Sequence, residues 1–192
     1  MARIVLASAS PRRRELLAAA GVEFEVIPAD VDESLPEGIE PEAGAVLLAR
    51  TKAVAVGERL GPRHALVLAA DTIVALGDRF LGKPADAEEA RSMLRALSLS
   101  RHAVVTGVAV LRTRDGALVT GFERTWVTMR EISPDEIEAY VRSGEWQGKA
   151  GGYAIQESAD RFVTRLEEGG FDNVVGLPVA LTLELLARQS ES

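Results

Sequence analysis

Residues 6–17, Leu-Ala-Ser-Ala-Ser-Pro-Arg-Arg-Arg-Glu-Leu-Leu, place polar and cationic side chains at the start of an expected helix. Ser10 is a typical helix N-cap, and Pro11 fits the first helical position, where its missing N–H costs nothing. The free N–H groups of a helix N-terminus attract anions. The hydroxyl and guanidinium groups beside this N-terminus belong to Ser8, Ser10, Arg12, Arg13 and Arg14. The stretch therefore predicts a phosphate site; the alternative is a capped surface helix with solvated arginines.

A carboxylate follows the most apolar stretch of the chain. Residues 65–70 form a nearly continuous apolar run, which is typical of a central strand covered on both faces. We expect this strand to end at or near Asp71 and Thr72, and ligands bind at the carboxyl ends of strands in open α/β sheets. A carboxylate is costly to bury there unless it is paired, protonated or metal-bound. Asp71 is therefore predicted to be functional.

Two lysines and an acidic loop are further candidates. Lys52 lies in a segment with a helical pattern from about 41 to 60, where its alternative interpretation is an exposed helix lysine; Lys83 lies between Gly82 and Pro84. The buried face of the helix is expected to contain Val46, Leu47, Ala53 and Val54. The loop after residue 28 contains Asp30, Asp32, Glu33 and Glu37. Such a loop is usually solvated, but beside a phosphate site one of its carboxylates would help to hold Mg²⁺.

The remaining segments indicate one α/β domain spanning residues 1–192, with no repeat or clear linker. Strands are expected at 23–27, at 101–112, after a turn at Gly116 through Phe122, Trp126 and Val127, and at 153–156. Helices are expected after a cap at Asp86, from Ser133 to about Ser143, and after residues 173–178. The segment from Gly144 to Lys149 is one residue too short for a Walker A loop and lacks its Ser or Thr.

Composition limits the chemistry. A formal net charge of -7 argues against a general nucleic-acid binder, while allowing a local basic pocket for a small phosphorylated ligand. The chain has no cysteine and two histidines, so any metal should be a hard cation held by carboxylates. No apolar run approaches membrane-spanning length and no signal sequence is evident, so we expect a cytoplasmic protein.

Seven dispersed blocks resemble the Maf family of nucleotide pyrophosphatases and occur in family order over nearly the whole chain. They lie at residues 6–17, 52–53, 70–72, 82–84, 106–108, 149–156 and 173–178. Two positions depart from the pattern: Glu157 stands where many members have Gly, and Gly170 where many have Ser. These departures affect details of the loops.

The resemblance implies a long twisted mixed sheet flanked by helices, related to the inosine triphosphatase architecture. It implies hydrolysis of a nucleoside triphosphate to the monophosphate and pyrophosphate with a divalent cation, Mg²⁺ or Mn²⁺, in a homodimer. By this resemblance, Asp71 matches the family's proton acceptor. The positions that match the family's other polar site residues are Ser8, Arg13, Glu33, Lys52 and Lys83. Arg12, Thr72 and Gln156 match the family positions linked to base choice. The segments Ser10-Pro11-Arg12 and Asp71-Thr72 resemble those of the dTTP/UTP branch.

Physical reasoning on the same residues leaves one division of roles open. Cleavage between the α- and β-phosphates needs cations to neutralise the leaving pyrophosphate, and Arg13, Lys52 and Lys83 would supply them. A carboxylate must hold the metal or accept the proton of water, and Asp71 and Glu33 are both candidates.

Two other functions remain open. A sugar-nucleotide nucleotidyltransferase also combines a first strand, a basic loop and a Lys-Pro element, but would need a glycine-rich turn that residues 8–10 do not supply. A nucleotide-binding regulator of cell division, acting through a partner, is the non-enzymatic alternative.

Overall fold

The computed structural model of the 192-residue chain describes residues 3–61 and 64–190. Its strands are β1 (Arg3–Leu6), β2 (Glu25–Val26), β3 (Ala65–Leu76), β4 (Arg79–Leu81), β5 (Arg101–Arg112), β6 (Leu118–Met129) and β7 (Val163–Glu167). Its α-helices are α1 (Pro11–Ala19), α2 (Pro41–Leu60), α3 (Ala87–Leu97), α4 (Pro134–Ser143), α5 (Phe171–Val175) and α6 (Val179–Ser190). Two 3₁₀ segments complete the described elements, η1 (Ala150–Gly152) and η2 (Ser158–Phe162).

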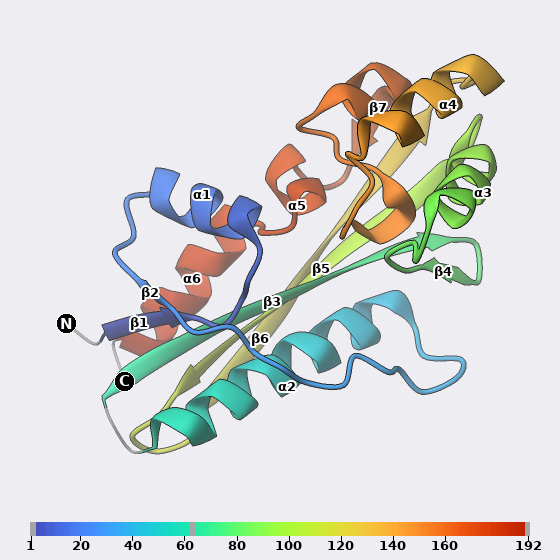
Figure 1. The fold of residues 1–192 in the computed structure, drawn as a ribbon. Helices are drawn as coiled ribbons and strands as arrows, with labels where there is room; N and C mark the ends of the chain where they lie inside the picture. The colour runs from blue at the N-terminus through green and yellow to red at the C-terminus, as the bar shows by residue number, and fades with distance from the viewer. Residues whose placement is uncertain (1–2, 62–63, 191–192) are drawn as a thin grey trace. The chain divides into compact units, whose positions relative to one another are not determined.

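The strands form one mixed sheet of seven, which confirms the predicted α/β class (Figure 1). Their order is β2-β1-β3-β5-β6-β7, with β4 paired to β3. β1 is parallel to both β2 and β3, whereas β4 runs antiparallel to β3 and β7 antiparallel to β6. In register, Val5 of β1 lies beside Val67 of β3.

The chain divides into two compact units. Unit 1 comprises Met1–Asp71, Thr106–Glu123 and Gly176–Ser192, and unit 2 comprises Thr72–Val105 and Arg124–Val175. The sequence predicts a single domain over residues 1–192, and this stays a prediction.

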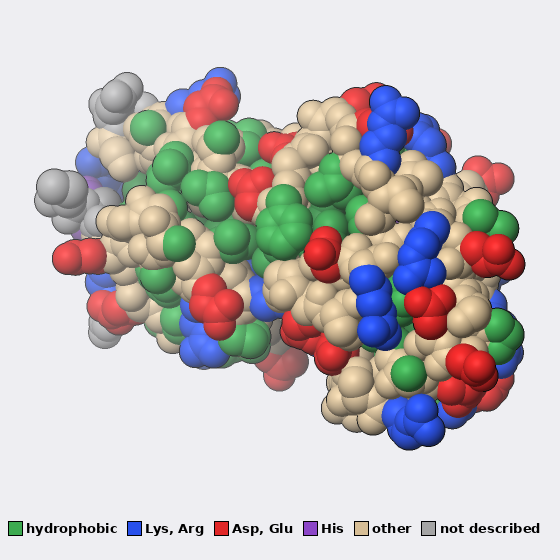
Figure 2. Space-filling view, turned by 90° about the horizontal axis from the view of Figure 1, so that it is seen from above, with side chains coloured by type: hydrophobic (Ala, Val, Ile, Leu, Met, Phe, Trp, Pro, Cys, Tyr) green, Lys and Arg blue, Asp and Glu red, His purple; other side chains and the backbone are tan. Residues whose placement is uncertain are grey.

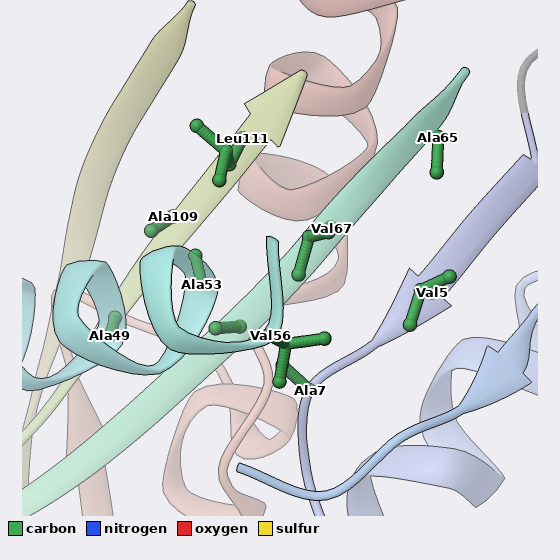
Figure 3. Close-up of a cluster of buried hydrophobic side chains, with 10 residues drawn as sticks. Val5, Ala7, Ala49, Ala53, Val56, Ala65, Val67, Ala109 and Leu111 are labelled. Atoms are coloured by element: carbon green, nitrogen blue, oxygen red, sulfur yellow. The ribbon is translucent and has the colours of Figure 1, made fainter. Parts of the chain in front are cut away.

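Unit 1 buries apolar side chains on both faces of its strands. Successive residues of a strand point to opposite faces, so Val5 and Val67 pack with α2 while Leu6 and Leu68 pack with α1 and α6. Figure 3 shows the first cluster, in which Ala49, Ala53 and Val56 of α2 lie over the sheet. This arrangement is the physical reason why the sequence of β3 is apolar without alternation.

The side of α2 that faces the sheet consists of small residues. Of the four positions expected to be buried, only Ala53 is buried. The other three, Val46, Leu47 and Val54, are partly buried or exposed. The buried residues are Gly44, Ala45, Leu48, Ala49, Lys52, Ala53, Val56 and Gly57. A Cβ on Gly107 of β5 would lie 2.3 Å from the Ala45 carbonyl group, so helix and strand approach too closely for a side chain there.

Unit 2 contains β4, β7, α3, α4, α5 and the two 3₁₀ segments, with parts of β3, β5 and β6. Its helix α4 begins after Ser133, where the sequence places a helix start, and it has a capping box in which Ser133 and Glu136 satisfy each other's backbone N–H groups. Asp86 caps α3 as expected, through the N–H of Glu89. The expected strand at 153–156 is wrong, because residues 153–154 have no regular structure and residues 155–157 form a turn that leads into η2.

The described surface carries both signs of charge. Acidic and basic side chains are interspersed on the face drawn in Figure 2, and neither sign forms a continuous field there. Within the described part of the chain, no helix combines the length and apolar character needed to cross a membrane.

Candidate functional site

The turn between β1 and α1 is built around two serine hydroxyls. Ser10 caps α1, its Oγ accepting the Arg13 N–H at 3.5 Å, and Pro11 follows in the first turn. Ser8, which is 6% exposed, accepts the N–H of Ser10 at 3.2 Å and an Nη1–H of Arg13 at 3.3 Å. The expected N-cap is confirmed, and the Arg13 guanidinium is fixed beside the helix N-terminus.

A second contact holds Arg13 from the C-terminal part of unit 1. Its Nε donates to the carbonyl oxygen of Gly176 at 2.7 Å, which joins residues far apart in the sequence. Burial lowers the pKa of Arg13 below its usual value, while the charges of Asp71 and Glu33 oppose that shift. An arginine with these neighbours remains a cation, since its ordinary pKa is above 12.

Asp71 lies within β3 rather than at its end, which corrects the sequence expectation. The strand continues to Leu76, with apolar residues returning at Ile73. Ala65, Val67 and Ala69 face α2, and the two-residue period places Asp71 on that face as well. Its 9% exposure makes it a buried carboxylate that needs a partner.

Lys52 of α2 provides that partner. Its Nζ donates to Asp71 Oδ1 and forms an ion pair with Glu33 Oε1 at 2.6 Å. Lys52 is 7% exposed, so its alternative interpretation as a solvated helix lysine is wrong. One ammonium therefore connects the buried strand carboxylate with an acidic side chain of the loop after β2.

These contacts form an ionic cluster in unit 1 made of Ser8, Arg13, Glu33, Lys52 and Asp71. It combines two cations with two carboxylates, which suits binding of phosphate oxygens together with acceptance of a proton. Two carboxylates converging on one cation also offer oxygen ligands for a divalent ion. Among residues 3–61 and 64–190, no group of three or more His, Cys, Asp or Glu residues forms a metal cage.

Arg12 stands next to this cluster in the first turn of α1. Its side chain is partly buried, and its charge lowers the pKa of Arg13. Like charges this close are tolerated when an anion or carboxylates neutralise them.

The other predicted residues, Thr72, Lys83 and Gln156, belong to unit 2. Thr72 follows Asp71 in β3 and is partly buried, and Lys83 and Gln156 are exposed. The carbonyl oxygen of Gly82, next to Lys83, accepts the N–H of Gly151 at 3.0 Å. This bond joins the loop after β4 to the loop that leads to Gln156.

Sequence reasoning assigned no role to several residues that shape these loops. The Gly176 carbonyl belongs to the block 173–178, but a backbone acceptor leaves no side-chain signal. His102 and Tyr153 form a buried pair in unit 2, their Nε2 and hydroxyl oxygen 2.8 Å apart. In the sequence, His102 is recognisable only as a single histidine at the start of the apolar stretch 101–112.

A family model described as Maf-like protein matches residues 3–189. A protein of Pelotomaculum thermopropionicum named dTTP/UTP pyrophosphatase is 46% identical over 188 residues, covering 98% of this chain and 97% of that protein. A protein of Anaeromyxobacter dehalogenans with the same name is 49% identical over 189 residues, covering 97% and 93%. A third, from a Thermoanaerobacter strain, is 43% identical over 187 residues, covering 97% and 96%.

Proposed function

Because the chain belongs to the Maf family, we propose that it hydrolyses dTTP and UTP to the nucleoside monophosphate and pyrophosphate. The observation that carries this proposal is the buried ion pair of Lys52 with Asp71, joined by Glu33 and placed beside Arg13. A buried lysine and carboxylate are costly to desolvate, and their retention in one place is typical of a reaction centre. Relatives named for this activity support the same conclusion.

The cations bind and neutralise the phosphates. Arg13 and Lys52 are oriented by their contacts with Ser8, Gly176 and Asp71, so little reorganisation is needed when charge develops on the leaving pyrophosphate. In the proposal Lys83 is the third cation that binds substrate phosphate.

Asp71 acts as the proton acceptor for the attacking water. Lys52 contacts Oδ1, and we assign proton acceptance to Oδ2. Glu33 contacts the same ammonium from a more exposed position, which suits a role in holding a metal.

The donor set fits a divalent cation, Mg²⁺ or Mn²⁺. Asp71 and Glu33 would hold it, and Mg²⁺ typically binds through one or two carboxylates, with waters and substrate phosphates as its other ligands. When bound, such a cation neutralises phosphate charge and helps to orient the reacting groups.

Base choice is assigned to Arg12, Thr72 and Gln156. Uracil and thymine present two carbonyl acceptors around one N3–H donor. Arg12 only donates, whereas Gln156 both donates and accepts, and Thr72 contributes a hydroxyl. Cytosine has a donor in place of one of these acceptors, so a fixed protein donor would oppose it.

Purified protein incubated with dTTP, Mg²⁺ and water alone tests the activity. We expect dTMP and pyrophosphate as primary products, because the sequence has no Walker A loop for γ-phosphate transfer. Chromatography separates these products from dTDP and orthophosphate. Formation of dTDP, or no turnover without a second substrate or partner protein, would contradict the proposal.

The proposal includes a homodimer, which the family resemblance implies and light scattering of the purified chain would test. A nucleotide substrate also favours a cytoplasmic enzyme without a nucleic-acid partner, in line with the net charge of -7.

A further inference from the structure

A fully buried histidine of unit 2 takes part in a hydrogen bond that the proposed mechanism does not use. His102 lies in β5 and is 0% exposed, and Tyr153 is 5% exposed. Their rings meet edge to face, with 5.6 Å between centroids and an interplanar angle of 85°. The His102 Nε2 and the phenolic oxygen are 2.8 Å apart, so two polar groups meet in the interior of unit 2.

The neighbouring groups fix the direction of this hydrogen bond. Ser100 Oγ donates to the carbonyl oxygen of Leu97 at 2.8 Å, so toward His102 Nδ1, 3.3 Å away, Ser100 acts as an acceptor. Nδ1 therefore carries the proton, and Nε2 of the neutral ring accepts from the Tyr153 hydroxyl. Burial lowers the pKa of His102 to about 4 and raises that of Tyr153, which agrees with two neutral partners.

Tyr153 belongs to a segment, residues 149–156, that has little regular structure of its own. Gly151 and Gly152 have φ angles of +70° and +68°, and a Cβ on Gly151 would lie 3.1 Å from Val74. The N–H of Gly151 donates to the Gly82 carbonyl oxygen at 3.0 Å, and the N–H of Ala154 donates to the Tyr140 hydroxyl oxygen at 3.1 Å. The bond from Tyr153 to His102 is a third hydrogen bond that joins this segment to a part of unit 2 distant in sequence.

The three anchors hold a backbone whose last residue is the exposed Gln156. A loop with glycines at positive φ has many alternative conformations, and directional bonds to fixed elements select one of them. Packing alone would accept a phenylalanine at position 153. The hydroxyl adds an orientation, because it must reach the one acceptor nitrogen of a ring held from its other side by Ser100.

We propose that His102 and Tyr153 are a positioning pair that fixes residues 149–156 so that Gln156 meets the pyrimidine base in one orientation. This inference rests on the proposed function. Neither residue touches substrate; the pair lowers the conformational cost of base recognition by ordering the segment before binding. A loss of the pair therefore affects binding and base preference more than the chemical step at Asp71.

Tyr153→Phe removes the hydroxyl and keeps the ring, and Thr125→Val is its control. Thr125 is also fully buried in unit 2, where its hydroxyl donates to the Gly170 carbonyl oxygen and accepts from Asn173. We expect Tyr153→Phe to raise KM for dTTP about fivefold, with kcat within about twofold, and to reduce the preference for dTTP over CTP. Thr125→Val should change neither KM nor preference, although it also loses a buried hydroxyl.

The histidine gives a graded second test. His102→Gln retains an acceptor oxygen for the phenol, whereas His102→Leu retains only volume. We expect the Gln variant to keep more of the base preference than the Leu variant. In the double variant, we expect His102→Leu to add little to the loss of base preference caused by Tyr153→Phe, because the hydrogen bond is already lost. Additive losses would overturn the assignment.

Hydrogen exchange in the protein without nucleotide provides a readout that does not depend on activity. The amides of residues 151–156 should exchange faster in Tyr153→Phe than in wild type or Thr125→Val. Unchanged exchange, or unchanged KM and base preference, would overturn the positioning role. A wild-type protein that releases no pyrophosphate would contradict the proposed function instead, and the exchange comparison would still decide whether the pair orders the segment.

Discussion

Replacing Asp71 with Asn tests the assignment of the proton acceptor with little change in shape. Asn retains an acceptor oxygen toward Lys52 but loses the charge. Lys52 keeps its ion pair with Glu33 at 2.6 Å, so the ammonium is not left buried without a carboxylate. We therefore expect a loss of about 1–2 kcal/mol in the free energy of unfolding, less than the roughly 3–5 kcal/mol for breaking an isolated buried pair.

The expected loss of turnover is much larger than the loss of stability. Removal of a general base typically lowers the rate by a factor of about 10² to 10⁴. Because Asp71 is also proposed to hold the metal, the loss of that ligand should lower the rate further. The assay is pyrophosphate release at saturating dTTP and Mg²⁺, combined with urea unfolding of the same preparation. Asp78→Asn makes the same chemical change in the exposed turn between β3 and β4 and should leave kcat unchanged. A folded Asp71→Asn protein that retains most of its kcat would refute the reasoning.

Four further predictions concern other residues. Glu33→Gln should lower activity at limiting Mg²⁺ and recover as Mg²⁺ is raised; a loss independent of Mg²⁺ would contradict a metal-holding role. Gln156→Ala should reduce the ratio of kcat/KM for dTTP over CTP, and an unchanged ratio would remove Gln156 from base choice. Because burial lowers the pKa of His102 from 6.5 to about 4, its contribution to stability is complete above pH 6.5. As the pH falls from 6.5 toward 4, the free energy of unfolding decreases by about 3 kcal/mol through protonation of His102 in the unfolded chain. His102→Gln should flatten that part of the unfolding profile, and an identical slope would contradict the assignment. Gly107→Ala should lower the free energy of unfolding, measured in urea, by about 3 kcal/mol, because its Cβ would meet the Ala45 backbone. A change within about 0.5 kcal/mol would contradict that close approach.

Local chemistry in the sequence was sufficient for the elements whose signals are carried by neighbouring residues. The helix expected at about 41–60 is α2 within the same bounds, and α4 begins at its Ser133 cap. Such signals succeed because a cap, a proline in the first turn and a terminating glycine act through bonds made inside the helix itself. The same applies to Ser10, whose capping bond to Arg13 spans three residues.

Side-chain types made Arg13, Lys52 and Asp71 candidates, and the family resemblance added their roles, but neither showed that these residues meet in unit 1. Nothing in the local sequence says that Lys52, in the middle of a helix, is buried against a strand carboxylate. That contact depends on α2 lying over the face of β3 to which Asp71 points. Burial of charge is decided by a partner distant in sequence, so only the tertiary structure shows it.

Tertiary structure likewise decided which face of α2 is buried and where β3 ends. Hydrophobicity favours Val46 and Leu47, yet the close approach of Gly107 to Ala45 requires small residues at the contact. The polar pair at 71–72 looks like the end of a strand, but β3 continues because Lys52 satisfies Asp71 within it. In each case long-range packing overrides a local pattern, since the energies of burial and pairing exceed those of local preference.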